Sequence, residues 1–559
     1  MKVGLIFFGA EPIDSIAQVF GSSIESLRQE HELIYLPPVY EFHSKARRME
    51  MLRDLMLSCD VLLGWLDDMV LRVRQDVNKQ IPYACLMLGS LPRGNTWMMD
   101  NYHLFRTTDA LLVNCSSDLE IANNFLENAQ VRLLPFSFDE SAFYPLDEAS
   151  KQALRATLGF NSEDKILLYC GRITLEKNVH SVLRIFSVIQ KLIPNARLVI
   201  AGSAHNTPVF QFFSAYSVNI SHTLDKVIAK LGIDRDKIRF LGHRDKADLR
   251  GLYNIADVAI NMTLNHDENF GLSQVEAMAC GTPVVGTNWG GLKDVIVDDE
   301  TGYKVSATMT ASGVKVNWWE AVSKIVSLLQ NESKYPQLRR KCVDIAHNKY
   351  SLSRYGENLR SILADCKGKA DEVGEPLRAS DFARRYWDSR KDITDLYYTY
   401  KELITPYTGT SQDIVDVDHR LNANQVVCLA TPLVEVDEES FKINDPIFPL
   451  SVTIPAEHKQ VIRTVIEVMR GEPAITAERL TNDYLAGQVN IPDALEWMIE
   501  AGLILRCGVE NEVLSTHSIG SQMSLPLFSF QDVNAESDVV VLRSKRGLKV
   551  HVGLGSVVG

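Results

Sequence analysis

Residues 268–285 read Glu-Asn-Phe-Gly-Leu-Ser-Gln-Val-Glu-Ala-Met-Ala-Cys-Gly-Thr-Pro-Val-Val, which sets two glutamates, Glu268 and Glu276, eight positions apart. The three- and four-residue spacing of Leu272, Val275, Glu276 and Ala279 predicts a helix that begins near Phe270-Gly271 and ends before the Gly-Thr-Pro stop. An apolar run of strand length, 256–262, and a polar loop precede it. We therefore expect Glu268 on the loop at the helix N-terminus, with Glu276 about two turns inside and leaning back toward that end.

A helix start of this kind is suited to binding an anion. Its first backbone N–H groups are unpaired, and Gly271 allows a ligand to approach them closely. A sugar nucleotide carries matching groups, namely a diphosphate for the amides, a ribose for one carboxylate and sugar hydroxyls for the other. Two glutamates at this spacing also occur by chance in long proteins, so the remainder of the chain must support the interpretation.

Further segments extend the pattern in order along the chain. They are Lys165–Asn178, Ala196–Gly202, Ile238–Gly242 and the pair Gly290-Gly291. With residues 268–285, they resemble the donor site of the retaining glycosyltransferases of the GT-B fold, in the large family four (glycosyl transferases group 1). The resemblance implies an α/β protein in which two Rossmann-like, doubly wound lobes face each other across a cleft. The nucleotide sugar would lie in the second lobe and the acceptor mostly in the first.

The hydrophobic pattern supports the same architecture. Six short apolar runs alternate with amphipathic stretches in the first part of the chain, at 3–8, 33–36, 61–65, 84–88, 110–114 and 131–134. Alternation of strands and helices predicts parallel β-α-β units, and a second such series covers 165–303. We expect an acceptor lobe at 1–145 and a donor lobe with its closing helix at 146–365. A linker and helical extension (366–454), a small module (455–510) and a strand-rich tail (511–559) would follow.

The resemblance also implies roles for individual residues. Arg172 and Lys177 stand where the family's phosphate-binding Arg and Lys stand, and a departing diphosphate needs such fixed cations; alternatively, they are solvated loop cations. Glu268 would lie beside the donor sugar and complete the catalytic set, while Glu276 would bond the ribose hydroxyls. The other expected donor contacts are Asn269, Phe270, Gly271, Leu272, Gly242 and His243. Retention by same-face attack is implied, in which the leaving phosphate helps to deprotonate the acceptor and no side chain is assigned as nucleophile.

No metal site or cofactor is expected beyond the nucleotide-sugar co-substrate, such as a UDP- or GDP-sugar. The triplet Asp416-Val417-Asp418 has the form of a metal-binding motif of the other major glycosyltransferase fold, but it follows the lobes and is interpreted as surface acid. The first lobe departs from the family pattern, because residues 84–94 contain no histidine where members often carry one near the donor sugar. His103 is nearest in sequence, and its helical pattern indicates packing or surface.

Composition limits the remaining classes of function. The chain has 559 residues, 46% of them apolar and 23% charged, which is typical of a globular protein of three or more domains. Its net charge of −13 disfavours nucleic-acid binding. Nine scattered cysteines without a C-x-x-C pair indicate reduced thiols. The N-terminus is interpreted as a first strand rather than a signal peptide, so we expect a cytoplasmic protein.

The C-terminal extension is harder to interpret. Residues 381–404 are expected to be helical with an aromatic stripe, for packing or as an acceptor platform. Three short helices, at 457–469, 477–484 and 492–501, with a trailing strand pair that includes 503–505, resemble a winged helix over about a tenth of the chain. Acidic residues outnumber basic ones there, which disfavours duplex binding. Recognition of a peptide or protein acceptor, self-association and a structural cap remain, and residues 539–558 are expected to form a hairpin.

Two classes of function are consistent with these patterns. The first is an active retaining glycosyltransferase whose acceptor is a glycan, a lipid-linked intermediate, a small molecule or a peptide. The second is a catalytically weak, sugar-nucleotide-binding scaffold or regulator that acts through its C-terminal module. The intact set of Glu268, Glu276, Arg172 and Lys177 favours the first. The donor sugar, the base and the acceptor are not specified by the sequence.

Overall fold

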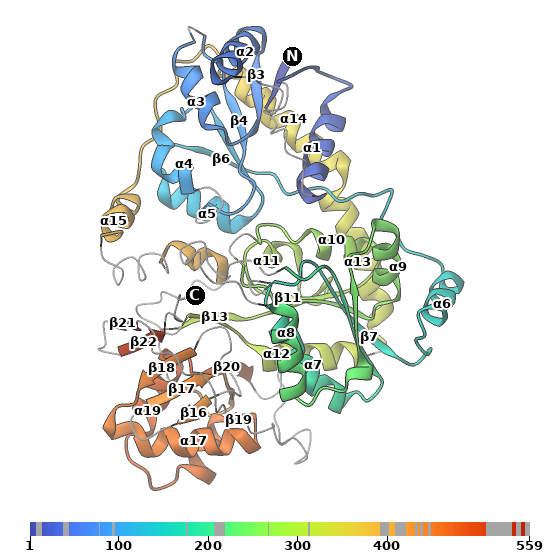
Figure 1. The fold of residues 1–559 in the computed structure, drawn as a ribbon, viewed down its shortest axis with the longest axis vertical. Helices are drawn as coiled ribbons and strands as arrows, with labels where there is room; N and C mark the ends of the chain where they lie inside the picture. Colours follow the sequence, from blue (N-terminus) through green and yellow to red (C-terminus); the bar gives the residue numbers. More distant parts are fainter. Residues whose placement is uncertain are drawn as a thin grey trace.

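The computed structural model describes residues 1–6, 14–36, 44–77, 79–91, 96–174, 177–205, 219–265, 268–310, 313–331, 333–391, 402–408, 421–430, 434–436, 440–444, 449–509, 539–543 and 549–553. Two α/β lobes form the upper and middle parts of the molecule, and a smaller α+β module lies below them (Figure 1).

The first lobe is built on a six-stranded parallel sheet in the order β2-β1-β3-β4-β5-β6. The strands are β1 (Lys2–Ile6), β2 (Glu32–Tyr35), β3 (Val61–Trp65), β4 (Tyr83–Leu86), β5 (Ala110–Val113) and β6 (Gln130–Leu133). The helices between them are α1 (Asp14–Leu27), α2 (Lys45–Ser58), α3 (Asp68–Gln75), α4 (Thr96–Asn101) and α5 (Ser116–Phe125). All six apolar runs of the first part are strands, so the expected doubly wound lobe is confirmed.

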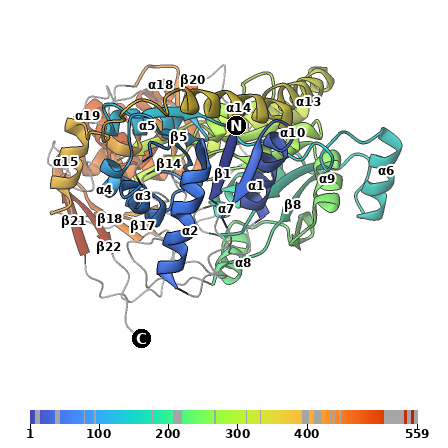
Figure 2. The same ribbon diagram turned by 90° about the horizontal axis from the view of Figure 1, so that it is seen from above.

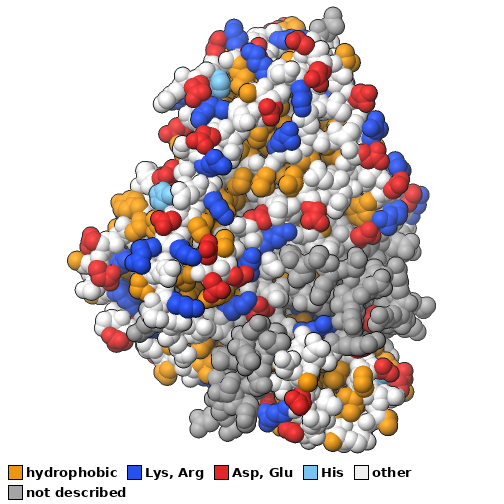
Figure 3. Space-filling model, turned by 180° about the vertical axis from the view of Figure 1, so that it is seen from behind, with side chains coloured by type: hydrophobic (Ala, Val, Ile, Leu, Met, Phe, Trp, Pro, Cys, Tyr) orange, Lys and Arg blue, Asp and Glu red, His pale blue; other side chains and the backbone are white. Residues whose placement is uncertain are grey.

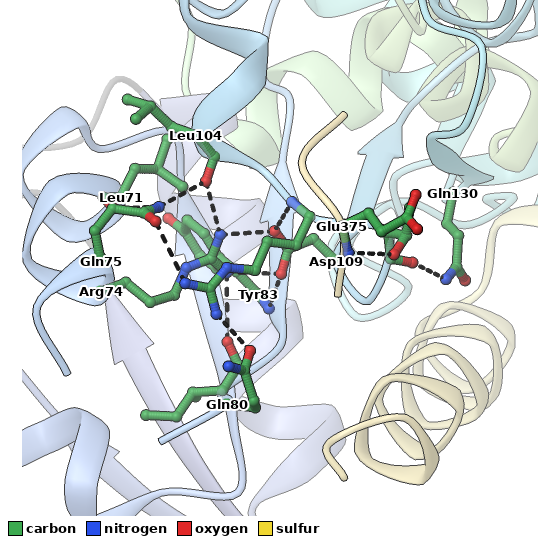
Figure 4. Close-up of polar contacts among 12 residues, drawn as sticks. Leu71, Arg74, Gln75, Gln80, Tyr83, Leu104, Asp109, Gln130 and Glu375 are labelled. Atoms are coloured by element: carbon green, nitrogen blue, oxygen red, sulfur yellow. Dashed lines mark hydrogen bonds and ion pairs between the residues drawn. The ribbon is translucent and has the colours of Figure 1, made fainter. Parts of the chain in front are cut away.

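A buried ion pair stabilises the amino-terminal edge of this sheet. The Arg74 guanidinium on α3 donates to both carboxylate oxygens of Asp109, at 2.6 and 2.7 Å, and both side chains are almost fully buried (Figure 4). Asp109 also accepts from the backbone N–H groups of Tyr83 and Arg106, at 2.9 and 2.8 Å. Because the carboxylate has a donor on every side, loss of Arg74 would leave an uncompensated buried charge, at a cost of about 3–5 kcal/mol. This network is structural, since it lies at the edge opposite the carboxyl ends of the strands.

The second lobe repeats the parallel design, with the strand order β12-β11-β10-β7-β8-β9. Its strands are β7 (Lys165–Cys170), β8 (Ala196–Ala201), β9 (Ile238–Gly242), β10 (Val258–Asn261), β11 (Val284–Thr287) and β12 (Gly302–Val305). Its helices are α6 (Glu148–Thr157), α7 (Val179–Leu192), α8 (Ile220–Lys230), α9 (Lys246–Ile255), α10 (Leu272–Ala279), α11 (Leu292–Val295), α12 (Trp318–Gln330) and α13 (Tyr335–Tyr350). A hairpin of β13 (Ala307–Thr310) and β14 (Gly313–Val316) is inserted before α12.

The chain then returns to the first lobe through α14 (Leu352–Gly368), which packs beside α1 (Figures 1 and 2). The hydroxyls of Tyr355 on α14 and Ser23 on α1 lie 2.8 Å apart. The expected closing helix is therefore present. Residues interpreted from the sequence as a polar linker follow the edge of the first lobe, where the Thr107 N–H donates to the Glu375 carbonyl at 2.8 Å. Next, α15 (Asp381–Ser389) packs on α5, with Phe382 against Phe125, so this part of the aromatic stripe is packing. Residues 392–401 lie outside the described residues.

The C-terminal module contains the three helical segments expected from the sequence, with a different strand pairing. They are α17 (Lys459–Gly471), α18 (Ala477–Arg479) with the turn Leu480–Tyr484 that continues it, and α19 (Ile491–Glu500). A trailing strand pair was expected, whereas β20 (Ile504–Val509) pairs antiparallel with β15 (Gln425–Leu429), and β19 (Ala474–Thr476) lies on the other side of β15. The central strand thus comes from before residue 455, a nonlocal pairing that hydrophobic periodicity does not reveal.

A second antiparallel sheet completes the module, in the order β16-β17-β18-β22-β21. Its strands are β16 (Val434–Val436), β17 (Ser440–Asn444), β18 (Pro449–Thr453), β21 (Val539–Arg543) and β22 (Lys549–Gly553). The expected hairpin is formed by β21 and β22. The module docks on the donor lobe at the start of α12, where the Trp318 indole N–H donates to the Leu429 carbonyl at 3.0 Å and the Asn317 amide donates to the Arg506 carbonyl at 2.6 Å.

The surface agrees with the acidic but mixed composition. Acidic and basic side chains are interspersed over the described part of the face shown in Figure 3. Among the described helices, none has both the length and the apolar character needed to cross a membrane.

Candidate functional site

Three glycines form a close-packed backbone surface at the carboxyl ends of β7, β8 and β9. The Gly171 N–H donates to the Ala201 carbonyl at 3.0 Å, and the Gly202 N–H donates to the Gly242 carbonyl at 2.8 Å. Gly202 has φ +152°, and a Cβ placed on it would lie 1.8 Å from the Gly171 carbonyl oxygen. Only glycine fits there, so this edge of the sheet presents backbone rather than side chains to any ligand.

The loop before α10 is positioned by a second pair of glycines. The helix begins immediately after Gly271, which has φ +93°, as predicted from the sequence. The Gly291 N–H donates to the Glu268 carbonyl at 2.8 Å. A Cβ on Gly291 would lie 2.2 Å from the Phe270 nitrogen, and a Cβ on Gly290 would lie 2.3 Å from the Glu268 carbonyl oxygen. The two glycines therefore allow residues 290–291 to hold the backbone of 268–270 directly.

Lys177 and Glu268 are brought together across 91 positions of sequence. The Lys177 ammonium lies 2.5 Å from a Glu268 carboxylate oxygen, and both side chains are largely buried. Lys177 is held in place because Asn178, in a left-handed conformation at φ +56°, donates from its side-chain amide to the Met262 carbonyl at the end of β10. One expected cation thus neutralises one expected carboxylate, and an arriving ligand would compete for both.

Glu276 lies on α10 and faces the interior, with 8% of its surface exposed. Burial raises the pKa of this carboxyl from 4.5 to about 8, although the Tyr253 hydroxyl donates to it at 3.3 Å. One long hydrogen bond does not satisfy a buried carboxylate. Hydroxyl donors from a ligand would therefore stabilise its ionised form.

Arg172, Gly242 and His243 occupy exposed positions at the same edge of the sheet. Arg172 follows β7 and His243 follows β9, with β8 between them. Within the described ranges, the Arg172 guanidinium has no hydrogen bond or ion pair, unlike Lys177. The structure thus brings Lys177 and Glu268 into contact, and it leaves Arg172 and His243 available to a ligand.

The first lobe contacts this region through residues to which the sequence analysis assigned no role. The Asn269 amide donates to the Asn114 side-chain oxygen at 2.9 Å. The Ser116 N–H and hydroxyl each donate to a carboxylate oxygen of Asp294, at 2.6 Å, so a residue of the second lobe caps α5 of the first. Contacts of this kind between lobes have no local sequence signal.

Other candidate residues are placed as follows. His103 lies in a short helical turn and contacts Tyr102 edge-on, and it is exposed, so of the two expected placements the structure shows the surface. Part of the stretch without a histidine, 92–94, and the triplet at 416–418 lie outside the described residues. In the ranges that the structure does describe, no group of three or more His, Cys, Asp or Glu side chains is arranged to hold a metal ion.

Comparisons with known proteins show what the second lobe and the two-lobed fold are similar to. Residues 150–347, which make up most of the second lobe, match the family model described as Glycosyl transferases group 1. Mannosylfructose-phosphate synthase of Agrobacterium fabrum is 30% identical over 191 residues, which are 34% of this chain and 40% of that protein. D-inositol 3-phosphate glycosyltransferase of Saccharomonospora viridis is 29% identical over 252 residues, 44% of this chain and 54% of that protein.

This chain therefore spans about half the length of these two curated relatives, 40% and 54%. Among solved structures, that of Anabaena Alr3699/HepE in complex with UDP superposes with a TM-score of 0.50 and 17% identity. The match covers 65% of this chain and 100% of that one. This match supports the two-lobed GT-B fold. At 17% identity, the similarity extends to the fold alone.

Proposed function

We propose that this protein is a retaining glycosyltransferase that transfers a sugar from a nucleotide-diphosphate sugar to an acceptor. The observation that carries the proposal is the arrangement of Lys177, Glu268 and Glu276 around the start of α10. This arrangement lies within the segment that matches the glycosyl transferases group 1 model. Both curated relatives are named for the synthesis or transfer of a glycoside.

Each residue has a task in the proposed reaction. Arg172, whose guanidinium has no hydrogen bond or ion pair among the described residues, meets the diphosphate together with Lys177 and stabilises the charge that develops as the leaving group departs. Glu276 accepts hydrogen bonds from the ribose hydroxyls, and Glu268 lies beside the donor sugar. The backbone of residues 269–272 and the Gly242-His243 loop contact the rest of the donor.

The acceptor attacks from the face that the diphosphate leaves, and a phosphate oxygen takes its proton. The anomeric configuration is retained, and no enzyme nucleophile is needed. Because two cations serve the diphosphate, the reaction proceeds without a metal ion. The acceptor lobe is assigned to residues 1–145 and the donor lobe to residues 146–365.

The C-terminal module is proposed to have a winged-helix-like core. This core would bind a protein or peptide partner or a second copy of the chain, and the protein would act in the cytoplasm. Its three helices and its acidic character support a protein partner rather than a nucleic acid. The acceptor remains one of four classes, a glycan, a lipid-linked intermediate, a small molecule or a peptide.

Donor hydrolysis tests the proposal. Wild-type protein is incubated with UDP-, GDP- and ADP-sugars, and free nucleotide is measured; UDP-sugars come first because the Alr3699/HepE structure contains UDP. Arg172→Ala removes a charged hydrogen bond worth about 1.5–3 kcal/mol, so turnover should fall about tenfold to a hundredfold. Arg235→Ala is the control, since this exposed arginine precedes β9 at the opposite edge of the same sheet.

Two results would count against the enzyme. If no donor binds or turns over, the chain is not a glycosyltransferase on these donors. If donors bind but do not turn over, the scaffold or regulator is the better description. Equal rates for Arg172→Ala and Arg235→Ala would remove the assigned role of Arg172.

A further inference from the structure

A short helical turn, Thr405–Thr408, lies between the two lobes at the donor loop. We call these four residues the clasp. They follow α15, which packs on the first lobe, and they precede the C-terminal module in sequence. Leu403, Ile404 and Tyr407 are buried in the hydrophobic core of the first lobe, and Trp289 of the second lobe belongs to the same core.

The clasp is bonded to both lobes through one carbonyl group. The Pro406 carbonyl accepts from the Ser117 hydroxyl on α5 at 3.1 Å and from the Lys293 ammonium on α11 at 2.5 Å. A single backbone oxygen therefore joins a helix of the first lobe to a helix of the second.

Tyr407 makes the same connection with its side chain and its backbone. Its hydroxyl donates to Asp118 on α5 at 2.6 Å, and its carbonyl accepts from the Gly290 N–H at 2.9 Å. Its ring is fully buried, with its centroid 5.4 Å from that of Trp289. A Cβ on Gly290 would lie 3.1 Å from this ring, so Tyr407 closely limits where residue 290 can lie.

Through Gly290 and Gly291, this contact reaches the candidate site. The Gly291 N–H bonds the Glu268 carbonyl, and Glu268 pairs with Lys177. On the first-lobe side, Asp118 also accepts from the Leu91 N–H at 3.3 Å, in the loop that follows β4. The clasp thus connects the loop of the first lobe that lacks a histidine with the loop of the second lobe that carries Glu268.

We propose that Tyr407 is a positioning residue that sets the Glu268 loop against the first lobe, and that a segment beyond the two lobes thereby completes the donor site. Its effect on rate rests on the function proposed above, whereas its effect on the backbone at 290–291 does not. Within the described residues, no hydrogen bond or ion pair joins the clasp to Glu276 or Arg172, the proposed ribose and phosphate partners, so Tyr407 should govern turnover more than nucleotide affinity.

The test combines kinetics with amide hydrogen exchange. Tyr407→Phe keeps the ring but removes the hydrogen bond that the hydroxyl donates to Asp118. The kcat of donor hydrolysis should fall about tenfold, while the Kd for UDP should change by less than about twofold. Exchange at the Gly290 and Gly291 amides should accelerate about tenfold. If the wild type has no turnover, the proposed function fails while the exchange experiment still tests the clasp.

Tyr355→Phe is the matched control, because it also removes a buried tyrosine hydroxyl bond, to Ser23, at a distance from the donor loop. It should leave kcat and the exchange of residues 290–291 unchanged. Lys293→Met removes one contact of the clasp and should give a smaller change in the same direction, which keeps the test available if Tyr407→Phe does not fold. The proposal is overturned if Tyr407→Phe behaves as the wild type, or if Tyr355→Phe reproduces its losses.

Discussion

The buried carboxyl of Glu276 makes the stability of the donor lobe depend on pH. Burial raises its pKa in the folded protein to about 8, against a value of 4.5 for an unhindered glutamate. Between these values the folded state holds a proton that the unfolded state has lost, so stability falls as pH rises from about 4.5 to 8. Each pKa unit corresponds to about 1.4 kcal/mol, so the loss approaches about 5 kcal/mol by pH 8.

Glu276→Gln removes this loss, because the amide does not ionise. The variant should resemble the wild type at pH 5 and should be the more stable protein at pH 8.5. For a lobe of this size, each kcal/mol changes Tm by roughly 2–4 °C, so the Tm advantage should grow by about 10 °C over this range. Differential scanning calorimetry at several pH values measures it, with Glu357→Gln, at an exposed glutamate on α14, as the control for loss of a carboxylate.

Nucleotide binding should show the opposite trend in the wild type. If ribose hydroxyls bond to the ionised carboxylate, binding releases a proton, and the affinity for UDP rises with pH up to about 8, by at most about tenfold per pH unit. Glu276→Gln should bind UDP weakly and without this dependence in isothermal titration calorimetry. A Tm difference between variant and wild type that stays constant from pH 5 to pH 8.5 would refute the reasoning.

Three further outcomes are expected. Gly202→Ala should unfold the donor lobe or abolish UDP binding, because backbone strain at its φ costs about 1–3 kcal/mol before the clash with the Gly171 carbonyl is counted. Gly232→Ala is the control for strain alone, since Gly232 has φ +60° and a Cβ there would have no atom within 4 Å. Thermal melts of the two variants therefore separate the cost of strain from the cost of the clash. Trp318→Phe leaves the Leu429 carbonyl without its donor, which costs about 1–3 kcal/mol of stability. Limited proteolysis should therefore release the C-terminal module about tenfold faster, while the rate of donor hydrolysis stays unchanged. Donor hydrolysis should keep its rate in excess chelator, and a loss that Mg²⁺ restores would contradict the metal-independent mechanism.

Local features of this chain were predictable from its sequence. The helix after Gly271 and the strands of both lobes follow from hydrophobic spacing and glycine signals, which act within a few residues. The candidate donor residues, in contrast, were assigned from the resemblance to the glycosyltransferase family. The fold places two of them, Arg172 and His243, after β7 and β9 at the same edge of the second sheet.

Contacts between distant segments could not be predicted in this way. The Asn114–Asn269 bond, the cap that Asp294 supplies to α5 and the insertion of β15 between β19 and β20 each join segments far apart in the chain. Tyr407 was missed for the same reason, since a lone tyrosine in a short turn has no periodic neighbours. The pairing of Lys177 with Glu268 was not foreseen either, because both were assigned to a ligand.

The burial of Leu403, Ile404 and Tyr407 in the core of the first lobe bears on the order in which the protein can fold during synthesis. The first lobe is translated first, yet its core includes side chains that leave the ribosome only after the whole donor lobe has been made. We expect the donor lobe to reach its native packing earlier, and the first lobe to keep apolar surface exposed until residue 407 has emerged. Chaperone binding to ribosome-bound chains should therefore persist past the end of the donor lobe and decline once the clasp is available.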